Sequence, residues 1–499
     1  MQYVLTAAEA RALDAATIAE LGLPGVVLME AAGRGVAAVV LRELAARPGP
    51  VAVVCGGGGN GGDGFVVTRV LRAAGVDVTA VVVIDPRAVA GDAAIHYRAL
   101  VRGGGPLVEV TARAALDLAL AGAAIVVDAV FGIGVTRPVT GWLAEVIAAI
   151  NAAPGRRIAV DVPSGVDADT GQIRGCAVRA DLTVAMALPK LGTVVAPGCA
   201  WAGAVECVDI GVAPRLVTAV APRAARIEAA DVARWLRPVE PLAHKFRRGH
   251  VLVIGGSPGK RGAARLTAQA ALRSGAGLVT LAGPADDGGE LAAPDPIMTA
   301  VIDDAAAVAA LLAGKGAVAI GPGMPDDDRG AAWLTAVIAA GLPTVIDATG
   351  LGHLAAGRVA LPAAHGPIVL TPHSGEAARI LGERAADVEA DRPAAARALA
   401  AATGCVVLLK GAGTIVCDGG DGAGRLVINS TGGPALATAG SGDVLAGVIA
   451  ALLAHGHPAA QAASLGAYLH GVAGDRAALS RDAGVIATDL LDALAAPPR

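Results

Sequence analysis

Residues 51–64 read VAVVCGGGGNGGDG, an apolar run from Val51 to Cys55 that enters a glycine-rich turn. The run predicts a buried strand, and the pattern after the turn predicts a helix from Phe65 to Ala74. More apolar runs bounded by turns follow at 78–84, 124–127 and 158–162. Runs this uniform are typical of parallel strands that helices cover on both faces. The N-terminal part of the chain therefore predicts an α/β domain with a doubly wound sheet.

The glycine turn departs from the fingerprint of dinucleotide-binding proteins. That fingerprint expects an acid about 20 residues further on, where the chain offers only Asp85, and it does not usually hold an acid such as Asp63 inside the turn. Open α/β sheets bind ligands at the carboxyl ends of their strands. The turn is therefore a candidate ligand loop that carries its own amide, Asn60, and its own carboxylate, Asp63.

Polar side chains also lie at two later strand ends. Asp128 follows the run 124–127, and Asp161 and Ser164 lie at the end of the run 158–162. Asn60, Asp128 and Ser164 supply oxygen donors without Cys or His, which suits a hard cation if the three converge. A single strand-end acid is more often a helix cap or a solvated turn residue. The cation site is favoured because three such positions occur in one sheet.

Length and composition indicate two domains, because 499 residues exceed one ordinary core. The segment 212–241 has scattered Pro and Arg with little strand pattern, so we expect domains at 1–220 and 221–499. A second strand and glycine turn begins at 249–256. Further strands are expected at 277–281, 317–320, 343–346, 367–370 and 405–409. The C-terminal domain is therefore also expected to be α/β.

Several classes of protein are disfavoured by composition. No apolar run reaches the roughly 18 residues of a membrane-spanning helix, although 54% of the residues are hydrophobic. The first residues lack a basic segment followed by an apolar core, so we expect a cytoplasmic protein. The six cysteines form no CxxC pair, which argues against zinc and for reduced thiols. A net charge of −4 offers no footprint for nucleic acid.

A second glycine turn, Ala439-Gly440-Ser441-Gly442-Asp443, precedes the apolar stretch 444–453. Unpaired amides at a helix start attract a phosphoryl group, and Asp443 is placed to take a proton from an attacking hydroxyl. Asp443 is equally compatible with a helix cap. The chain contains no GxxxxGK[ST] motif, which excludes a P-loop enzyme.

Two further segments of the C-terminal half are candidate ligand contacts. Residues 410–414, KGAGT, end a predicted strand and are suited to hold the phosphate and ribose of a nucleotide with backbone amides. His373 lies in the turn 371–376, TPHSGE, where a histidine is either a ligand contact or a solvated side chain. The sequence leaves these alternatives open.

The motifs NGGDG, VVDAVFGIG and DVPSGVDADTG resemble the NAD(P)H-hydrate epimerase domain, which has a Rossmann-like fold, over about residues 3–215. The resemblance implies potassium ligands at Asn60, Asp128 and Ser164 and a catalytic acid/base at Asp161. It implies contacts to the hydrated dinucleotide from Asp161 and from two loops: Gly59, Asn60, Gly61, Gly62 and Asp63, and Gly132, Ile133, Gly134, Val135, Thr136, Arg137 and Pro138. Gly59 stands where the family usually has Asn.

The C-terminal motifs resemble the ADP-dependent NAD(P)H-hydrate dehydratase domain, which has a ribokinase-like fold, over about residues 225–495. The resemblance implies contacts to the hydrated dinucleotide at Ala263, Gly323, His373 and Asp443. It implies nucleotide contacts at Lys410, Gly411, Ala412, Gly413, Thr414 and Gly442. The segment Asp347–Gly350 and Gly433 depart from the family pattern, and we expect neither to touch these residues.

Together the two resemblances imply a bifunctional enzyme that repairs hydrated nicotinamide cofactors. Its substrates would be the hydrates NADHX and NADPHX, with ADP or ATP as co-substrate, K⁺ in the N-terminal domain and Mg²⁺ in the C-terminal domain. Asp443 would activate the ring hydroxyl, and Asp161 would interconvert the epimers. We also expect a homo-oligomer. Two rivals remain: a small-molecule kinase of the ribokinase superfamily with an ancillary domain, and an N-terminal domain that only binds or serves as a scaffold.

Overall fold

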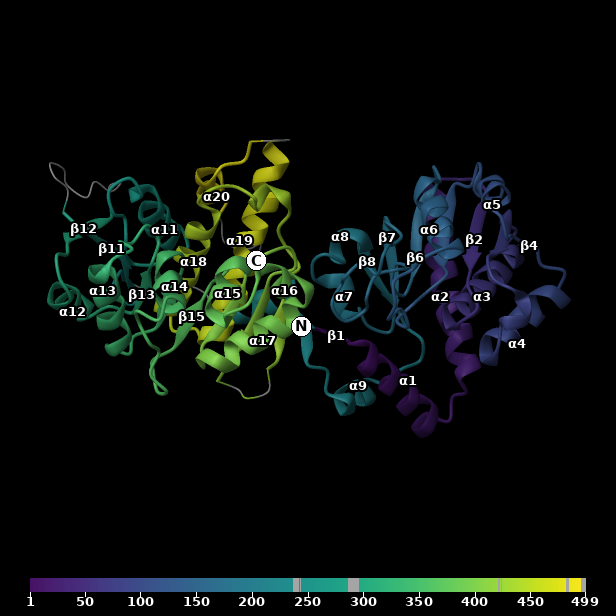
Figure 1. Cartoon of the computed structure of the whole chain (residues 1–499), viewed down its shortest axis with the longest axis horizontal. Helices are drawn as coiled ribbons and strands as arrows, with labels where there is room; N and C mark the ends of the chain where they lie inside the picture. The colour runs from purple at the N-terminus through teal and green to yellow at the C-terminus, as the bar shows by residue number, and fades with distance from the viewer. Residues whose placement is uncertain are drawn as a thin grey trace. The chain divides into compact units, whose positions relative to one another are not determined.

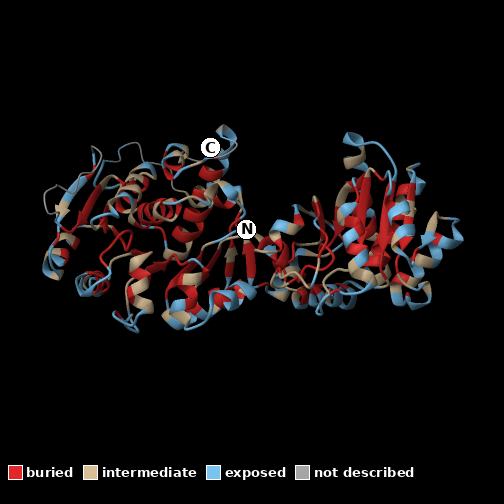
Figure 2. Ribbon diagram, turned by 45° about the horizontal axis from the view of Figure 1, so that its top comes forward, coloured by how far each residue is buried: buried red, intermediate tan, exposed pale blue. Residues whose placement is uncertain are grey.

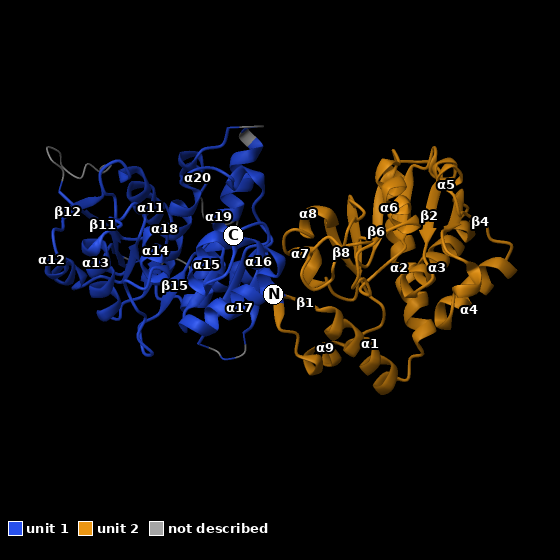
Figure 3. Ribbon diagram, viewed as in Figure 1, with its two compact units in different colours: residues 1, 225–499 blue, residues 2–224 orange. Residues whose placement is uncertain are grey.

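The computed structural model describes residues 1–236, 242, 244–285, 296–420, 422, 424–481 and 484–494. The chain forms two compact units (Figure 3). The N-terminal unit comprises Gln2–Ala224, and the C-terminal unit comprises Met1 and Ala225–Arg499. Figure 1 shows helices packed around a sheet in each unit. In both units the strands are mostly buried and the outer faces of the helices are exposed (Figure 2).

The N-terminal sheet has the strand order β4-β3-β2-β5-β6-β7-β8, and every neighbouring pair is parallel. Val51 of β2 pairs with Val78 of β3 on one side and with Ile125 of β5 on the other. The chain leaves β2 toward β3 and later returns to β5, so the crevice between β2 and β5 is a topological switch point. The strands are β2 (Val51–Cys55), β3 (Val78–Val82), β4 (Leu107–Glu109), β5 (Ile125–Ala129), β6 (Arg156–Val160), β7 (Leu182–Met186) and β8 (Ala204–Val208).

Helices cover both faces of this sheet, as the doubly wound prediction requires. Phe65 and Val36 belong to the core on one face, and Leu116 and Ile147 belong to the core on the other. The remaining elements of the unit are β1 (Gln2–Val4), α1 (Ala7–Leu21), α2 (Gly25–Ala46), α3 (Gly59–Ala73), η1 (Pro86–Ala88), α4 (Gly91–Arg102), α5 (Arg113–Leu120), α6 (Trp142–Ala152), α7 (Leu191–Val194), α8 (Cys199–Ala202) and α9 (Pro214–Val220).

Helix α3 begins at Gly59, six residues earlier than the sequence predicts. The prediction that Gly59–Asp63 form a loop is therefore wrong, because these residues are the first turns of the helix. A Cβ atom at Gly61 would lie 1.9 Å from the carbonyl oxygen of Gly56. Glycine is required there so that the helix can start this close to the end of β2. Residues with poor helix propensity are helical in this segment because tertiary packing overrides that propensity.

The C-terminal sheet runs β9-β18-β17-β16-β15-β14-β13-β10-β11-β12. The strands from β16 through β12 in this order are parallel to one another, whereas β17 pairs antiparallel with both β16 and β18. The strands are β9 (Ala224–Arg226), β10 (His250–Ile254), β11 (Leu278–Gly283), β12 (Met298–Val301), β13 (Ala317–Ile320), β14 (Thr344–Ile346), β15 (Ile368–Leu370), β16 (Val406–Leu409), β17 (Ile415–Asp418) and β18 (Leu426–Ile428).

Helices α11 (Arg261–Arg273), α18 (Ser441–Ala454) and α19 (Ala459–Ser480) supply much of the C-terminal core. The other helices are α10 (Ala229–Trp235), α12 (Ala305–Leu312), α13 (Asp328–Ala339), α14 (Thr349–Ala355), α15 (Ser374–Leu381), α16 (Ala385–Ala390), α17 (Arg392–Thr403), η2 (Pro434–Leu436) and α20 (Ala487–Ala493). Helix α18 is buried along nearly its whole length. None of the helices in the described ranges combines the length and apolar composition needed to cross a membrane.

Candidate active sites

The N-terminal unit has a cavity of about 580 Å³ at the carboxyl ends of β2, β5, β6 and β7. Helices α1 and α2 close its other side with Asp14, Leu28 and Met29. Seven of the expected substrate contacts line it: Gly59, Asn60, Asp63, Gly132, Ile133, Gly134 and Asp161. The cavity therefore lies where the strand order predicts a ligand site.

The other expected contacts of this unit do not line the cavity. Gly61 and Gly62 lie beneath it, and a Cβ at Gly62 would meet Sδ of Met29 at 2.4 Å. Val135 lies in the loop that follows the cavity wall, and Thr136, Arg137 and Pro138 in that loop are exposed. Residues 135–138 could therefore contact a ligand only where it extends out of the cavity.

Asp161 follows β6 directly and holds a strained backbone, with φ of 67°. Its Oδ1 accepts a hydrogen bond from the backbone N–H of Met186 at 2.9 Å and an ion pair from the ammonium of Lys190. Lys190 is 2% exposed, and its Nζ also donates to the carbonyl oxygens of Met186 and Leu188. Strained residues of this kind cluster at functional sites. The geometry fixes the carboxyl group of Asp161 at the cavity wall.

Two more carboxyl groups share the cavity with Asp161. Asp63 is 9% exposed, and burial raises its pKa well above the usual range, with Asp161 and Asp14 adding to the shift and Lys190 opposing it. Burial also raises the pKa of Asp14, against the effect of Lys190. Three acids therefore surround one ammonium group, and only Asp161 forms an ion pair with it in the described part of the chain.

The three expected cation ligands meet around the carbonyl group of Phe131. The amide nitrogen of Asn60 donates to that oxygen at 2.8 Å, and Oγ of Ser164 lies 3.2 Å from it. Oγ of Ser164 also donates to Oδ1 of Asp128 at 2.6 Å. Burial raises the pKa of Asp128 to about 6, although hydrogen bonds from Ser164 and Val130 oppose the shift. Asn60, Asp128 and Ser164 are thus brought together.

The donor set fits a hard monovalent cation. Asn60, Asp128, Ser164 and the Phe131 carbonyl offer only oxygen atoms. A Cβ atom at Gly132 would lie 3.1 Å from Oδ1 of Asn60, so glycine leaves room beside that oxygen. Within the described residues, no group of three or more His, Cys, Asp or Glu side chains is arranged to hold a metal ion. A cation in the N-terminal unit would therefore rely on amide, hydroxyl and carbonyl oxygens as well as a carboxylate.

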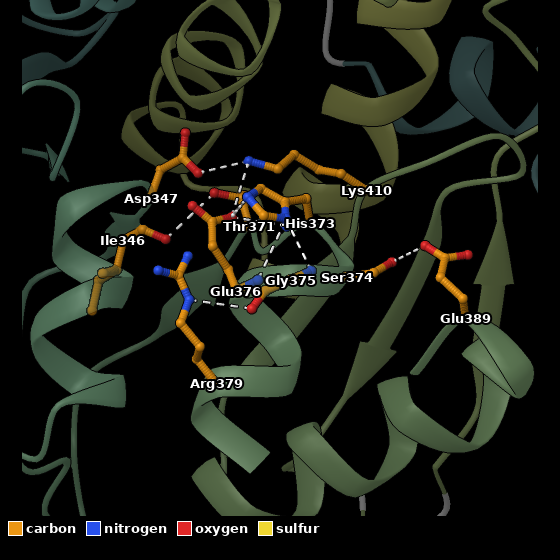
Figure 4. A network of polar contacts seen from close by, with 10 residues as sticks. All are labelled: Ile346, Asp347, Thr371, His373, Ser374, Gly375, Glu376, Arg379, Glu389 and Lys410. Carbon is orange, nitrogen blue, oxygen red and sulfur yellow. Dashed lines mark hydrogen bonds and ion pairs between the residues drawn. The ribbon is translucent and has the colours of Figure 1, made fainter. Parts of the chain in front are cut away.

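In the C-terminal unit, a polar network surrounds the side chain of Lys410 (Figure 4). Its Nζ donates to Oδ1 of Asp347 at 2.9 Å and lies 3.7 Å from Oε2 of Glu376. Burial opposes the charge on Lys410, but the attraction of Asp347, Glu376 and Asp443 outweighs it and holds the pKa above its ordinary value. The expectation that the Asp347 segment does not touch the carried-over residues is wrong, because Asp347 directly follows β14 and faces the end of β16.

Asp443 is the third residue of α18. The N-cap of that helix is Gly440, which takes φ of 87°, and no side chain caps it. Burial raises the pKa of Asp443 to about 6, the Asp347 carboxylate adds to the shift, and Lys410 opposes it. The structure does not use Asp443 as the helix cap. Its carboxyl group therefore lies at the amino end of α18, near Lys410 and Asp347.

His373 is the N-cap of α15. Its Nδ1 accepts hydrogen bonds from the backbone N–H groups of Gly375 and Glu376, at 3.0 and 3.4 Å. Nε2 lies 3.6 Å from Oε2 of Glu376, and the side chain is 56% exposed. Figure 4 shows the imidazole beside Glu376 and Lys410. The ring is held in place by the helix and presents an open face to a ligand.

The segment 410–414 forms a turn fastened by a buried arginine. Nη1 of Arg392 donates to the carbonyl oxygen of Ala412 at 2.9 Å, and Nη2 donates to that of Lys410 at 3.0 Å. Gly411 takes φ of 142° directly against the guanidinium, where a Cβ would lie 2.6 Å from Nη2. Gly413 takes φ of 61°, and the hydroxyl of Thr414 donates to the carbonyl of Gly411 at 2.8 Å. Arg392 thus fixes two carbonyls of the turn, and the N–H of Lys410 donates to the carbonyl oxygen of Pro372 at 2.8 Å.

The remaining expected contacts lie near the amino ends of α11 and α18. The hydroxyl of Thr267 lies 3.1 Å from the carbonyl oxygen of Ala263 and 3.0 Å from that of Asp443, so it joins the two helices. Gly323 is buried, and its carbonyl accepts from both the N–H and the hydroxyl of Ser257 at 2.7 Å. Gly442 lies beside the network, since its Cβ position is 3.5 Å from Nζ of Lys410.

Family models match both units. A YjeF-related N-terminal family matches residues 25–192, and the NAD(P)H-hydrate dehydratase family matches residues 251–496. A bifunctional NAD(P)H-hydrate repair enzyme from Moorella thermoacetica is 41% identical over 99% of this chain and 96% of the relative. One from Salinibacter ruber is 38% identical, over 98% of this chain and 95% of the relative. The chain belongs to the family of bifunctional NAD(P)H-hydrate repair enzymes.

A solved ADP/ATP-dependent NAD(P)H-hydrate dehydratase from Bacillus subtilis is 30% identical to this chain. It covers 53% of this chain and 94% of its own, with a TM-score of 0.47. The predicted resemblance to the repair-enzyme family is confirmed by the family models and the full-length relatives. The expected combination of a Rossmann-like and a ribokinase-like α/β domain is confirmed with it. Membership favours repair over the rival of a kinase with an ancillary domain.

The structure places several groups in these sites that the sequence did not single out. Lys190, Asp14 and Asp347 were not expected as site residues, nor was the Phe131 carbonyl. One signal was available for Lys190, because the chain has only five lysines against 35 arginines. Lys190, unlike Lys410, lies outside the glycine-rich segments. No comparable sequence signal marks Asp14.

Proposed function

We propose that this chain epimerises the R and S forms of NADHX and NADPHX and dehydrates the S form to NADH or NADPH, with ADP as phosphoryl donor and AMP and phosphate as products. The observation that carries the proposal is the position of Asp443. Its carboxyl group lies at the amino end of α18 beside Lys410 and Asp347, in a chain whose other unit holds Asp161 at the wall of a cavity.

In the C-terminal site, Asp443 acts as general base. It takes the proton of the ring hydroxyl, and the hydroxyl oxygen forms a bond to the terminal phosphorus of ADP while the bond to AMP breaks. The N–H groups of Gly440–Asp443 stabilise the negative charge that moves during this transfer. Loss of the phosphate with its electron pair, and of a proton from the neighbouring ring carbon, then restores the reduced nicotinamide.

The ligands occupy different parts of that site. The turn Lys410–Thr414 and Gly442 bind the AMP portion, because Arg392 fixes the carbonyls of the turn while Gly411 and Ala412 are exposed. Ala263, Gly323, His373 and Asp443 contact the hydrated dinucleotide. His373 suits this role because α15 fixes its imidazole while leaving one face exposed.

In the N-terminal cavity, Asp161 takes and returns the proton of the hydroxyl on the ring carbon as the ring opens and recloses. Lys190 holds the carboxyl group of Asp161 in place through the ion pair. The cavity-lining residues of Gly59–Asp63 and Gly132–Pro138 bind the dinucleotide, and helix α3 directs its amino end toward the phosphates.

Two cations belong to the proposal. K⁺ would be held in the N-terminal unit by Asn60, Asp128, Ser164 and the Phe131 carbonyl, where it would neutralise the buried carboxylate and fix the cavity loops. Mg²⁺ would enter the C-terminal site with the nucleotide. It is usually bound by phosphate oxygens and one or two carboxylates, and Asp443 is the carboxylate there that Lys410 does not hold in an ion pair. Mg²⁺ would screen the phosphate charges.

The compartment and the assembly stay predictions. We propose the cytoplasm, because Cys55, Cys176 and Cys405 are free thiols, as expected in a reducing compartment. The expected homo-oligomer is also kept as a prediction.

The test supplies the purified chain with a mixture of both hydrate epimers and ADP, and follows the absorbance of the reduced nicotinamide. Wild-type protein should convert both epimers. Asp443→Asn should lose recovery of both, whereas Asp161→Asn should recover the S form and leave the R form. No recovery by wild-type protein with either ADP or ATP would refute the repair reaction, and accumulation of a phosphorylated product would favour the kinase rival.

A further inference from the structure

Asp63 is a buried acid whose carboxyl group has no hydrogen-bond or ion-pair partner in the described ranges of the chain. It is 9% exposed and lines the N-terminal cavity, on the second turn of α3. A buried carboxyl group without a partner is costly, because it loses hydration and gains nothing in return. Binding of the dinucleotide as proposed above does not require an acid at this position.

Asp161, which follows β6 and lines the same cavity, has the contrasting environment. Its carboxylate receives the ammonium of Lys190 and the N–H of Met186, and both stabilise the ionised form. Asp63 has neither donor. Two carboxyl groups in one cavity with such different surroundings are the arrangement in which one serves as acid and the other as base.

The charged groups around Asp63 favour its neutral form. Asp161 and Asp14 act on it as negative neighbours, and Lys190, the positive neighbour, is already paired with Asp161. Asp92 is a further carboxyl group on the cavity wall. Burial is the largest contribution, and together these groups raise the pKa of Asp63 well above its usual range. These surroundings therefore favour the protonated form of Asp63, which has a proton to donate.

We propose that Asp63 is the catalytic acid of epimerisation and works opposite Asp161, the base. Asp161 removes the proton of the ring hydroxyl, the C–O bond becomes a carbonyl, and the bond from that carbon to the ring nitrogen breaks. Asp63 donates its proton to the nitrogen, which receives the electron pair. Rotation of the carbonyl presents its other face, and the reverse steps close the ring and return both protons. The inference rests on the proposed epimerase function.

The first experiment measures interconversion of the separated epimers by the full chain without ADP, so that dehydration is absent. Asp63→Asn preserves the shape of the side chain but cannot donate an acidic proton. We expect kcat to fall by about 100-fold or more, with KM within about threefold of wild type. Asp117→Asn on the exposed face of α5 is the matched control and should leave both unchanged. Wild-type kcat in Asp63→Asn would overturn the inference.

A pH profile separates acid catalysis from a structural role. Epimerisation by wild-type protein should decline as pH rises through the pKa of Asp63, because the proton is then lost. Asp14→Asn removes a negative neighbour, so the decline should move to lower pH. Asp63→Glu should restore part of the rate lost in Asp63→Asn. An unmoved decline in Asp14→Asn, or no rescue by Glu, would contradict the assignment.

Recovery of the S epimer with ADP reports whether each variant leaves the C-terminal site intact. If wild-type protein does not interconvert the epimers at all, the epimerase function itself fails. If wild-type protein interconverts them and Asp63→Asn does so equally fast, only the role of Asp63 fails.

Discussion

Nζ of Lys410 lies 2.9 Å from Oδ1 of Asp347, a residue 63 positions earlier in the chain and 2% exposed. Both groups act on the ionisation of Asp443, and they act in opposite directions. The carboxylate of Asp347 adds to the shift that burial imposes, whereas the ammonium of Lys410 opposes it. The pair therefore sets the pH at which the proposed base becomes active.

Substitutions in this pair should move the pH profile of dehydration in opposite directions. Asp443 must be ionised to accept a proton, so activity should rise with pH through its pKa of about 6. Asp347→Asn removes a negative neighbour and should move that rise to lower pH. Lys410→Met removes the positive neighbour and should move it to higher pH. The measurement is kcat with saturating ADP at pH values from about 4.5 to about 8. Shifts in the same direction would contradict the electrostatic role.

The buried pair of Ser441 and His470 should matter for the first turn of α18. Oγ of Ser441 lies 3.1 Å from Nε2 of His470 on α19, and burial lowers the pKa of His470 to about 4, so the imidazole is neutral. Ser441→Ala leaves a buried ring nitrogen without its partner and should cost about 1–3 kcal/mol of unfolding free energy.

The control is Ser464→Ala, because the hydroxyl of Ser464 bonds only to its own helix, at Ala460, in the contacts described. It should cost less than Ser441→Ala when the unfolding free energies of the two variants are measured by urea titration. The double variant Ser441→Ala with His470→Leu should lose less stability than the sum of the single variants, because neither polar group is then left alone. Additive losses would show that the two side chains do not interact.

Two glycines of the N-terminal ligand helix should respond in opposite ways to substitution. Gly59→Asn should fold normally, since no atom lies within 4 Å of the Cβ position, and it should bind hydrate at least as tightly as wild type. Gly61→Ala places a Cβ 1.9 Å from the carbonyl oxygen of Gly56 and should destabilise the unit by about 3 kcal/mol. Thermal unfolding of both variants checks this. Equal melting temperatures would contradict the close approach of α3 to β2.

Potassium should support epimerisation but not dehydration. Replacing K⁺ by tetramethylammonium should lower the epimerase rate of wild-type protein, because the bulky cation cannot be ligated by Asn60 and Ser164. Asp128→Asn removes the negative ligand. The K⁺ concentration needed for half of the maximal rate should then rise about tenfold, which corresponds to about 1.4 kcal/mol of binding free energy. Recovery of the S epimer with ADP serves as the internal control. An epimerase rate indifferent to K⁺ would refute the site.

Residues adjacent in the chain were the predictable part of each site. The run Val51–Cys55, the glycines after it and the turn at 439–443 reveal a strand, a ligand turn and a helix start, because each uses a local pattern. Asn60, Asp128 and Ser164 could be grouped because parallel strands end at one edge of a sheet. The start of α3 was misplaced, since glycine propensity argues against a helix that tertiary packing imposes.

Sequence alone determined that the chain has two α/β domains of the repair-enzyme family and predicted which loops bind ligands, because those signals lie in short contiguous motifs. Tertiary structure decided the chemistry of individual carboxyl groups. Asp161 forms an ion pair with the ammonium group of Lys190, 29 positions away. The pKa of Asp443 is shifted by burial and by the charges of Asp347 and Lys410. Asp63 carries the same side chain as Asp161 but receives no such donor. The ionisation of a carboxyl group depends on burial and on charges across space, and neither is encoded in the residues beside it.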